Sequence, residues 1–177
     1  RKAGIPPERC IHTHPIKRDS DIRHTLDYGV TTFVADNPDE IDKFVAYRDR
    51  VRLLLRLSFR SAEAVVDLSR KFGCDTEAAL ELARRAARAK IRVAGLSFHV
   101  GSQVARPDMY LQAIETCGAL IADAGRRKLG PFEVLDIGGG FPIDYLEPVT
   151  PIAEFCAPIR EALAKLPAQR PGVVDTY

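Results

Sequence analysis

Short apolar runs recur along the chain and alternate with segments of helical periodicity. The runs are rich in Val, Ile, Leu, Phe and Thr, a composition typical of strands. We expect six strands, at residues 10–13, 31–35, 51–57, 93–100, 132–137 and 172–174. The runs are apolar on both faces, which indicates a parallel sheet covered by helices.

Five helices are expected between and after these strands. We expect them to begin at Asp19 or Ser20, after Asn37, at Asp75 or Thr76, near Tyr110 and after Pro151. Asn37 followed by Pro38 and two acidic residues is typical of a helix start. The fourth helix has the clearest apolar stripe, which runs from Tyr110 to Ala124, and Gly125 is the expected stop.

Alternating strands and helices predict an α/β protein. Two architectures remain open, a doubly wound sheet and a (β/α) barrel of the TIM type. A closed barrel has about eight strands and roughly 250 residues, whereas this chain has 177 residues. We therefore expect either an open sheet or an incomplete barrel, with no domain boundary inside the chain.

Composition and charge are those of an ordinary globular protein. The chain is 46% hydrophobic and 28% charged with a net charge of +2, which is ordinary for a globular protein and favours neither nucleic acid nor an anionic membrane as partner. The basic cluster within residues 84–90 lacks aromatic interleaving, which favours a solvated face. No apolar stretch reaches the roughly 18 residues of a membrane span.

The cysteines and the chain ends add two expectations. Four separate cysteines without a CxxC pair argue against a zinc knuckle or a disulfide scaffold, and favour a cytoplasmic protein without a bound metal. The chain starts at Arg1 without an initiator Met, and residues 172–177 resemble the beginning of a strand. We expect a piece of a longer protein.

The candidate chemistry lies at or just after the carboxyl ends of expected strands. Lys17, Arg56, residues 98–103 and residues 138–140 all have this position. In parallel α/β folds this edge of the sheet carries the ligand site.

Gly138, Gly139 and Gly140 can be interpreted in two ways. Three glycines after a strand allow backbone N–H groups to turn inward and hold a phosphate. They are also compatible with a tight turn that takes the chain out of the sheet. The run matches neither GxGxxG nor a P-loop, and its place at a strand end favours phosphate.

His99 is followed by Gly101, Ser102 and Gln103. A single histidine in an apolar strand is commonly a core residue, and no further metal ligands lie nearby. In the functional interpretation the imidazole lies flat against a planar ligand, while Ser102 and loop N–H groups bind an anionic group.

Other polar residues leave alternatives open. Arg56 suits a surface salt bridge or an anionic partner. Lys17 and Lys71 could react with a carbonyl group, although most lysines are solvated. His12 and His14 point to one side of their strand, but two histidines without a third ligand favour a structural role.

Several segments together resemble the pyridoxal-phosphate-dependent ornithine decarboxylases. They are Pro15-Ile16-Lys17, Leu55-Arg56-Leu57, Lys71-Phe72-Gly73 and residues 95–103 and 135–142. SFHVGSQ and DIGGGFP are specific in combination, and residues 13–18 look like the bacterial ornithine or ornithine/lysine enzymes. Diaminopimelate decarboxylases typically have another histidine in place of Phe98, so this position favours the diamine-forming branch.

The resemblance implies an incomplete alanine-racemase-like (β/α) barrel over residues 1–177, followed in complete enzymes by a β-rich domain, and a homodimer with shared active sites. It implies that His99 stacks on pyridoxal 5′-phosphate, that Ser102 and Gly138, Gly139 and chiefly Gly140 bind its phosphate, and that Arg56 lies near its polar edge. The family's cofactor-linking lysine would precede Arg1, and the residues that complete the pocket would follow Tyr177.

The expected function is therefore decarboxylation of L-ornithine to putrescine and carbon dioxide in polyamine synthesis, by the complete protein. The alternatives are lysine or diaminopimelate as substrate, a decarboxylase-like protein that has lost its chemistry and regulates a partner, or a phosphate-binding α/β protein without this cofactor.

Overall fold

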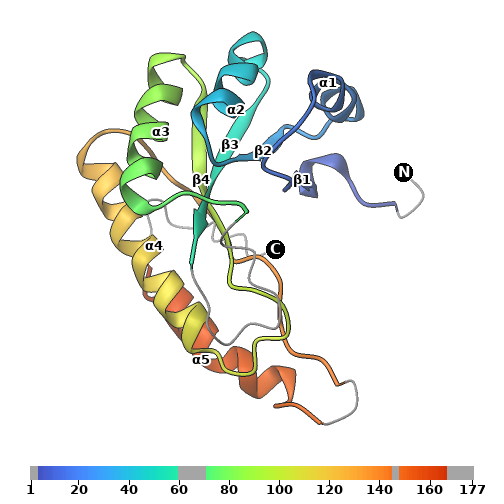
Figure 1. The fold of residues 1–177 in the computed structure, drawn as a ribbon, viewed down its shortest axis with the longest axis vertical. Helices are drawn as coiled ribbons and strands as arrows, with labels where there is room; N and C mark the ends of the chain where they lie inside the picture. The colour runs from blue at the N-terminus through green and yellow to red at the C-terminus, as the bar shows by residue number, and fades with distance from the viewer. Residues whose placement is uncertain (1–3, 60–70, 145–147, 167–177) are drawn as a thin grey trace.

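The computed structural model describes residues 4–59, 71–144 and 148–166. Its helices and strands alternate along the chain (Figure 1). In chain order they are a 3-10 helix Pro7–Arg9, β1 Ile11–His12, α1 Asp19–Tyr28, β2 Thr32–Ala35, α2 Pro38–Lys43, a 3-10 helix Phe44–Tyr47, β3 Arg52–Ser58, α3 Thr76–Arg88, β4 Arg92–His99, α4 Asp108–Arg126, β5 Val134–Asp136 and α5 Ile152–Ala164.

Local sequence explains where the helices begin and end. The Asn37 side chain accepts the Glu40 N–H at 2.9 Å and caps α2, and Asp75 caps α3 in the same way through Ala78. The expected stop of α4 is wrong by a short distance. The helix runs through Gly125 to Arg126, and the left-handed residue that follows is Lys128, with φ of 58°.

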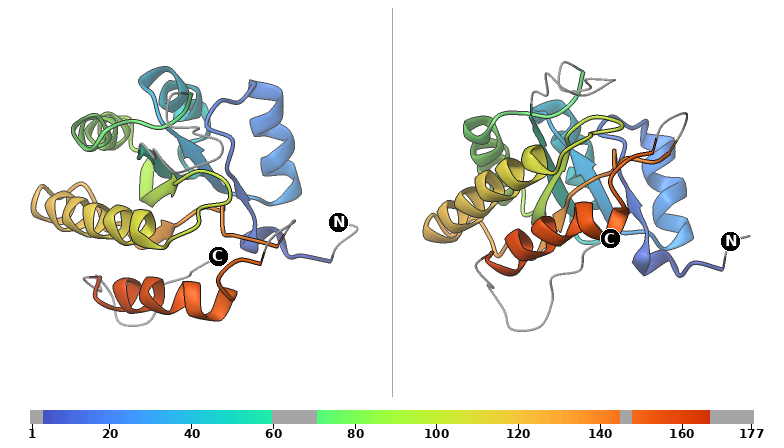
Figure 2. Two further views of the ribbon diagram at one scale, coloured as in Figure 1. Left: turned by 60° about the horizontal axis from the view of Figure 1, so that its bottom comes forward. Right: turned by 90° about the horizontal axis from the view of Figure 1, so that it is seen from below.

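The five strands form one parallel sheet in the order β1-β2-β3-β4-β5. A doubly wound sheet would reverse its strand order at a switch point, and this sheet does not. It curls instead, with the helices around its outer side, as in half of a (β/α) barrel (Figure 2). The barrel prediction is confirmed in this incomplete form, while the expected strand at residues 172–174 lies outside the described residues.

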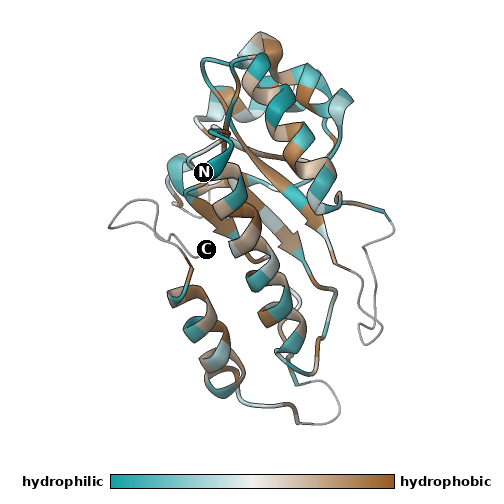
Figure 3. Ribbon diagram, turned by 90° about the vertical axis from the view of Figure 1, so that its left-hand side faces the viewer, coloured by the Kyte–Doolittle hydropathy of each residue, from teal (hydrophilic) through white to brown (hydrophobic). Residues whose placement is uncertain are grey.

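The hydrophobic core lies mainly between the sheet and the helices. Phe33, Leu53, Leu55 and Leu96 point outward from the strands and pack in one large cluster with the helices, and the strands are correspondingly apolar in Figure 3. Among the described residues, the inner face carries a small cluster, made of Val34, Leu54, Ala94 and Val134. The inner face is therefore free to carry polar side chains beyond this cluster.

All four cysteines are free thiols. In the described ranges, no helix has the length and apolar character needed to cross a bilayer.

Candidate functional site

A polar layer crosses the inner face of the sheet just beyond its small apolar cluster. Arg56 of β3 is in register with Ser97 of β4, which is in register with Asp136 of β5. Neighbours in register point to the same face of a sheet. The Ser97 hydroxyl donates to the Asp136 carboxylate at 3.0 Å, and this bond joins β4 to β5 where the site begins.

Arg56 is a half-buried cation in this layer. Burial lowers the pKa of its guanidinium, while the charges of Asp36 and Asp136 act in the opposite direction. Its guanidinium carbon lies 5.4 Å from the centre of the Phe72 ring. Within the described part of the chain no carboxylate forms an ion pair with Arg56, so an anionic ligand could still pair with its charge.

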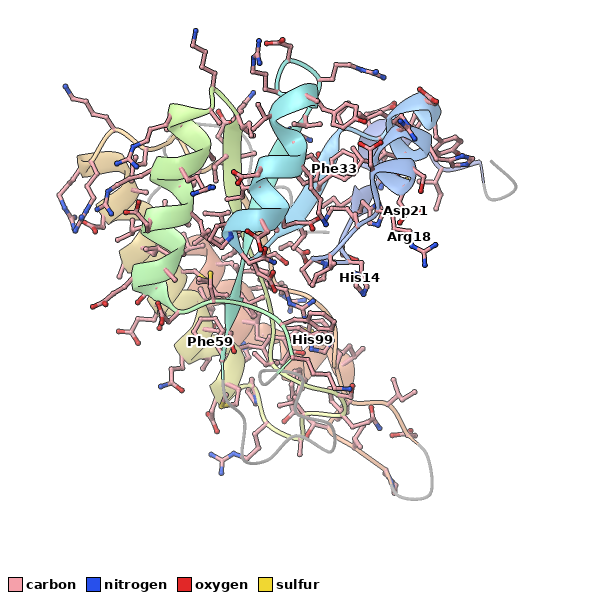
Figure 4. All side chains as sticks on the ribbon, turned by 45° about the horizontal axis from the view of Figure 1, so that its top comes forward. His14, Arg18, Asp21, Phe33, Phe59 and His99 are labelled. Carbon is pink, nitrogen blue, oxygen red and sulfur yellow. The ribbon has the colours of Figure 1, made fainter. Side chains whose placement is uncertain are left out.

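His99 is the last residue of β4 and lies at the carboxyl end of the parallel strands (Figure 4). Its Nδ1 accepts the Gly101 N–H at 3.0 Å, and since a backbone amide can only donate, the neutral ring carries its proton on Nε2. Burial and the nearby Arg56 charge lower the pKa of His99 below its usual value of 6.5, against a smaller effect of Asp136. The ring is therefore neutral at pH 7.

The three glycines follow β5 and differ in what they require. Gly138 and Gly140 have φ of +70° and +97°, and a Cβ on either would fall within 2.3 Å and 1.7 Å of the carbonyl oxygens of Phe98 and Gly101. The tight turn thus explains these two. A Cβ on Gly139 would meet only the His99 Nε2, at 3.9 Å, so the chain itself leaves room there and the room lies beside the imidazole.

In the described part of the chain, three backbone groups of the glycine loop are bonded to the protein, while two of its N–H groups are not. The Gly138 N–H donates to Asp136 at 2.9 Å. The Gly139 and Gly140 carbonyls accept from the Tyr110 hydroxyl at 2.8 Å and from the Val104 N–H at 3.0 Å. Among the described residues, the N–H groups of Gly139 and Gly140 have no acceptor. Adjacent N–H groups of this kind form an anion-binding concavity.

Ser102 lies in the segment that borders this loop. The Gly101 carbonyl on one side of it abuts Gly140, and Val104 on the other side bonds to Gly140. The Ser102 hydroxyl has no hydrogen-bond partner in the described ranges and is partly exposed. The structure thus brings Arg56, His99, Ser102 and the glycine loop to the ends of three adjacent strands.

Lys17 also lies near this edge, and the expectation of a solvated lysine is wrong for it. Its side chain is 0% exposed, and its ammonium donates to Glu40 at 2.9 Å and to the carbonyls of His14 and Val34 at 2.8 and 2.6 Å. All three of its N–H groups are used. Lys71, the other candidate, is exposed.

His12 and His14 have different surroundings. β1 ends at His12, so His14 lies outside the strand. His12 pairs with the Thr25 hydroxyl at 3.1 Å, and His14 lies edge-on to Phe72 with ring centres 5.3 Å apart. The described residues contain no group of three or more side chains that could hold a metal ion.

Three contributors were missed by reasoning from the sequence. Asp36 accepts the Gly73 N–H at 2.7 Å beside Arg56. Asp136 orders both Ser97 and Gly138. Tyr110 reaches the glycine loop from α4. Only Asp136 had a signal, as an acidic residue inside an apolar strand next to the glycines.

The chain matches a known family over nearly its whole length. Residues 1–174 match the model of the pyridoxal-dependent decarboxylase family, pyridoxal binding domain.

Similar proteins agree with this match. The lysine/ornithine decarboxylase of Selenomonas ruminantium is 35% identical over 79% of the chain and 35% of its own length. Rat ornithine decarboxylase is 36% identical over 78% of the chain and 30% of its own length. The chain therefore spans about a third of the curated relatives that it matches.

Solved structures are similar in both sequence and shape. A lysine/ornithine decarboxylase from Vibrio vulnificus, complexed with cadaverine, is 51% identical with a TM-score of 0.86, over 94% of this chain and 43% of that one. The arginine decarboxylase of Paramecium bursaria Chlorella virus, bound to agmatine, is 29% identical with a TM-score of 0.81, over 93% of this chain and 44% of that one.

Proposed function

Because the chain belongs to the pyridoxal-binding domain family of the pyridoxal-dependent decarboxylases, we propose that the protein uses pyridoxal 5′-phosphate to decarboxylate L-ornithine to putrescine and carbon dioxide. One observation carries the proposal. The neutral His99 ring lies beside a glycine loop with two N–H groups that have no acceptor in the described part of the chain.

The residues present fit this cofactor. The N–H groups of Gly139 and Gly140 suit a phosphate, and the Ser102 hydroxyl borders the same loop and adds a donor. A Cβ on Gly139 would project toward the His99 ring, so the glycine keeps open the space that a flat heterocycle would occupy. A neutral imidazole stacks on such a ring without adding a second positive charge next to Arg56.

The side chains of this domain bind and orient. When bound, pyridoxal phosphate supplies a conjugated ring that accepts the electron pair left as the substrate carboxylate departs as carbon dioxide. His99 would hold that ring by stacking against it, and so would help to orient it for the reaction. The Arg56 guanidinium would place positive charge at the ring's polar edge, and the charges of Asp36 and Asp136 favour its charged state.

Basic amino acids are the substrates that the relatives support. The names of the curated relatives above include both ornithine and lysine, and Phe98 favours the diamine-forming branch over diaminopimelate. Lysine is the second candidate, because the 51% identical Vibrio vulnificus enzyme was solved with cadaverine. One methylene separates the two substrates, which is worth only about 1–3 kcal/mol of discrimination.

The setting of the reaction belongs to the same proposal. We infer a homodimer with shared active sites that acts in polyamine synthesis in the cytoplasm, on the strength of the family alone. A decarboxylase-like regulator without chemistry is the alternative that the experiment must separate.

The test uses the full-length protein purified with pyridoxal phosphate. We expect an absorbance band from bound pyridoxal, a lysine trapped by borohydride reduction, and release of carbon dioxide from ornithine, measured beside lysine, arginine and diaminopimelate. Release from lysine alone would replace the substrate. Bound cofactor without release from any of the four would favour the regulator, and no bound cofactor would overturn the proposal.

A further inference from the structure

Tyr110 connects the outer helix layer to the candidate site. It is in the first turn of α4 and is 0% exposed. Its hydroxyl donates to the Gly139 carbonyl at 2.8 Å. A buried hydroxyl that reaches the middle of a ligand loop does more than fill space, because a phenylalanine would pack equally well without it.

The aromatic surroundings hold this hydroxyl in place. The Tyr110 ring is stacked on Phe141 with centres 4.9 Å apart and an angle of 19°, and it meets Phe155 of α5 edge to face at 5.9 Å. Phe141 directly follows the glycines. The Tyr110 ring therefore packs against the end of the glycine loop, while the Tyr110 hydroxyl binds the middle of the loop.

The hydrogen bond from Tyr110 to the Gly139 carbonyl also sets the direction of the next N–H group, through the geometry of the peptide. In a planar trans peptide the C=O of one residue and the N–H of the next point in opposite directions. A Gly139 carbonyl drawn toward Tyr110 therefore aims the Gly140 N–H away from α4. The Val104 N–H holds the Gly140 carbonyl by the same rule and thereby aims the Phe141 N–H.

We propose that Tyr110 is a positioning residue for phosphate binding, acting through the Gly139 carbonyl on the Gly140 N–H. The inference rests on the proposed function, since the phosphate is that of the cofactor. Tyr110 itself touches no ligand in this scheme; it presets the loop, so that the N–H groups need no reordering when an anion arrives.

The variant Tyr110→Phe tests the role, because it removes one oxygen and keeps the ring. Equilibrium titrations of the full-length protein compare pyridoxal 5′-phosphate with pyridoxal, which lacks the phosphate. Loss of a single neutral hydrogen bond predicts a roughly twofold to tenfold weaker affinity for pyridoxal phosphate. The affinity for pyridoxal should stay unchanged, so that the ratio of the two affinities falls.

Tyr47→Phe is the matched control. It also deletes a tyrosine hydroxyl that makes a side-chain hydrogen bond, here to Asp19 at 2.6 Å, but outside the site. Its ratio of affinities should equal that of the unmodified protein.

The possible results separate this inference from the function beneath it. An unchanged ratio in Tyr110→Phe, or equal weakening for both ligands, would overturn the positioning role and leave the cofactor site standing. If the unmodified protein itself binds neither ligand, or shows no preference for the phosphorylated one, the proposed phosphate site fails and the inference fails with it.

Discussion

Lys17 and Arg56 both place a positive charge at the edge of the sheet where the strands end, yet their surroundings differ. Lys17 is fully buried and meets three acceptors, the Glu40 carboxylate and two backbone carbonyls. Arg56 is half-buried, lies over the Phe72 ring, and has no ion pair in the described part of the chain. At one end of the sheet edge the polar groups bind one another, and at the other end some of them have no partner in the described part of the chain.

The difference separates a structural region from the candidate site. Buried polar groups are nearly always satisfied in a folded protein, and the Lys17 network meets this rule with its own chain. Lys43 extends it, donating to Glu40 at 2.6 Å and to the Lys17 carbonyl at 2.8 Å. In the region of Arg56, its guanidinium and the N–H groups of Gly139 and Gly140 remain able to bind a ligand. Lys17 is thus a structural residue, although it lies where sequence reasoning expected chemistry.

The largest effect, a loss of folding free energy, is expected from breaking the buried ion pair between Lys17 and Glu40. Glu40→Gln leaves the Lys17 ammonium buried without its ion-pair partner, and removing one partner of a buried pair costs about 3–5 kcal/mol of folding free energy. Burial already lowers the pKa of Lys17, while Glu40 favours its charged form. Urea unfolding of the full-length protein measures the loss as a lower midpoint.

Asp42→Asn is the control for this change. It breaks the pair between Asp42 and Arg85, whose side chains are 48% and 46% exposed. Solvent weakens such a pair, so the midpoint should barely move. Equal losses in the two variants would mean that the Lys17 network is no more important than a surface ion pair.

A smaller effect is expected from the glycine loop. Substitution of Gly140 should lower stability, and substitution of Gly139 should lower affinity for the cofactor. Gly140→Ala forces a Cβ against the Gly101 carbonyl at positive φ, which should lower the free energy of unfolding by roughly 1–3 kcal/mol. Gly139→Ala adds its methyl group where only His99 is near. It should keep its stability and lose affinity for pyridoxal phosphate. Thermal unfolding and cofactor titration measure the two quantities.

The difference between the two glycines is what distinguishes a turn from a site. If Gly139→Ala binds the cofactor normally, the space beside His99 is not where the ring lies. If Gly140→Ala is as stable as the unmodified protein, the loop adjusts freely and its geometry is not preset.

The fold was largely predictable because its signals are local. Five of the expected strands and all five helices are found, since apolar runs and caps such as Asn37 and Asp75 act within a few residues. The end of α4 was misplaced because Gly125 marks a stop by residue type, whereas Lys128 takes the left-handed conformation. The choice of a curled over a doubly wound sheet rested on the family resemblance, because strand order is a long-range property.

The site was predictable only in part, for the same reason. Arg56, His99, Ser102 and the glycines lie together as expected, because the ends of parallel strands meet at one edge. Their partners were not predicted. Tyr110 is 29 residues from Gly139, and Glu40 is 23 residues from Lys17, so each had the appearance of an ordinary helix residue. A pattern along the chain reveals which side chains gather, but not which hydrogen bonds they complete.

The smallest effect is expected from pH, and it draws on both regions. Burial lowers the pKa of His12 beside α1 and of His99 in the site below the usual 6.5. As pH falls below 6.5 the unfolded chain takes up protons that the folded chain still refuses, so the folded state loses stability until the pH has passed the lowered values.

The free energy of unfolding, measured from urea curves at intervals from pH 8 downward, should therefore decline below pH 6.5, and each of His12→Asn and His99→Asn should remove part of the decline. The two variants differ in their response to ligand. Pyridoxal phosphate stacked on His99 would change both the burial and the charge around that ring, so bound cofactor should shift the part of the decline that His99→Asn removes and leave the His12 part in place. A decline that the cofactor shifts equally in both variants would show that the ligand stabilises the fold as a whole, without contact to His99.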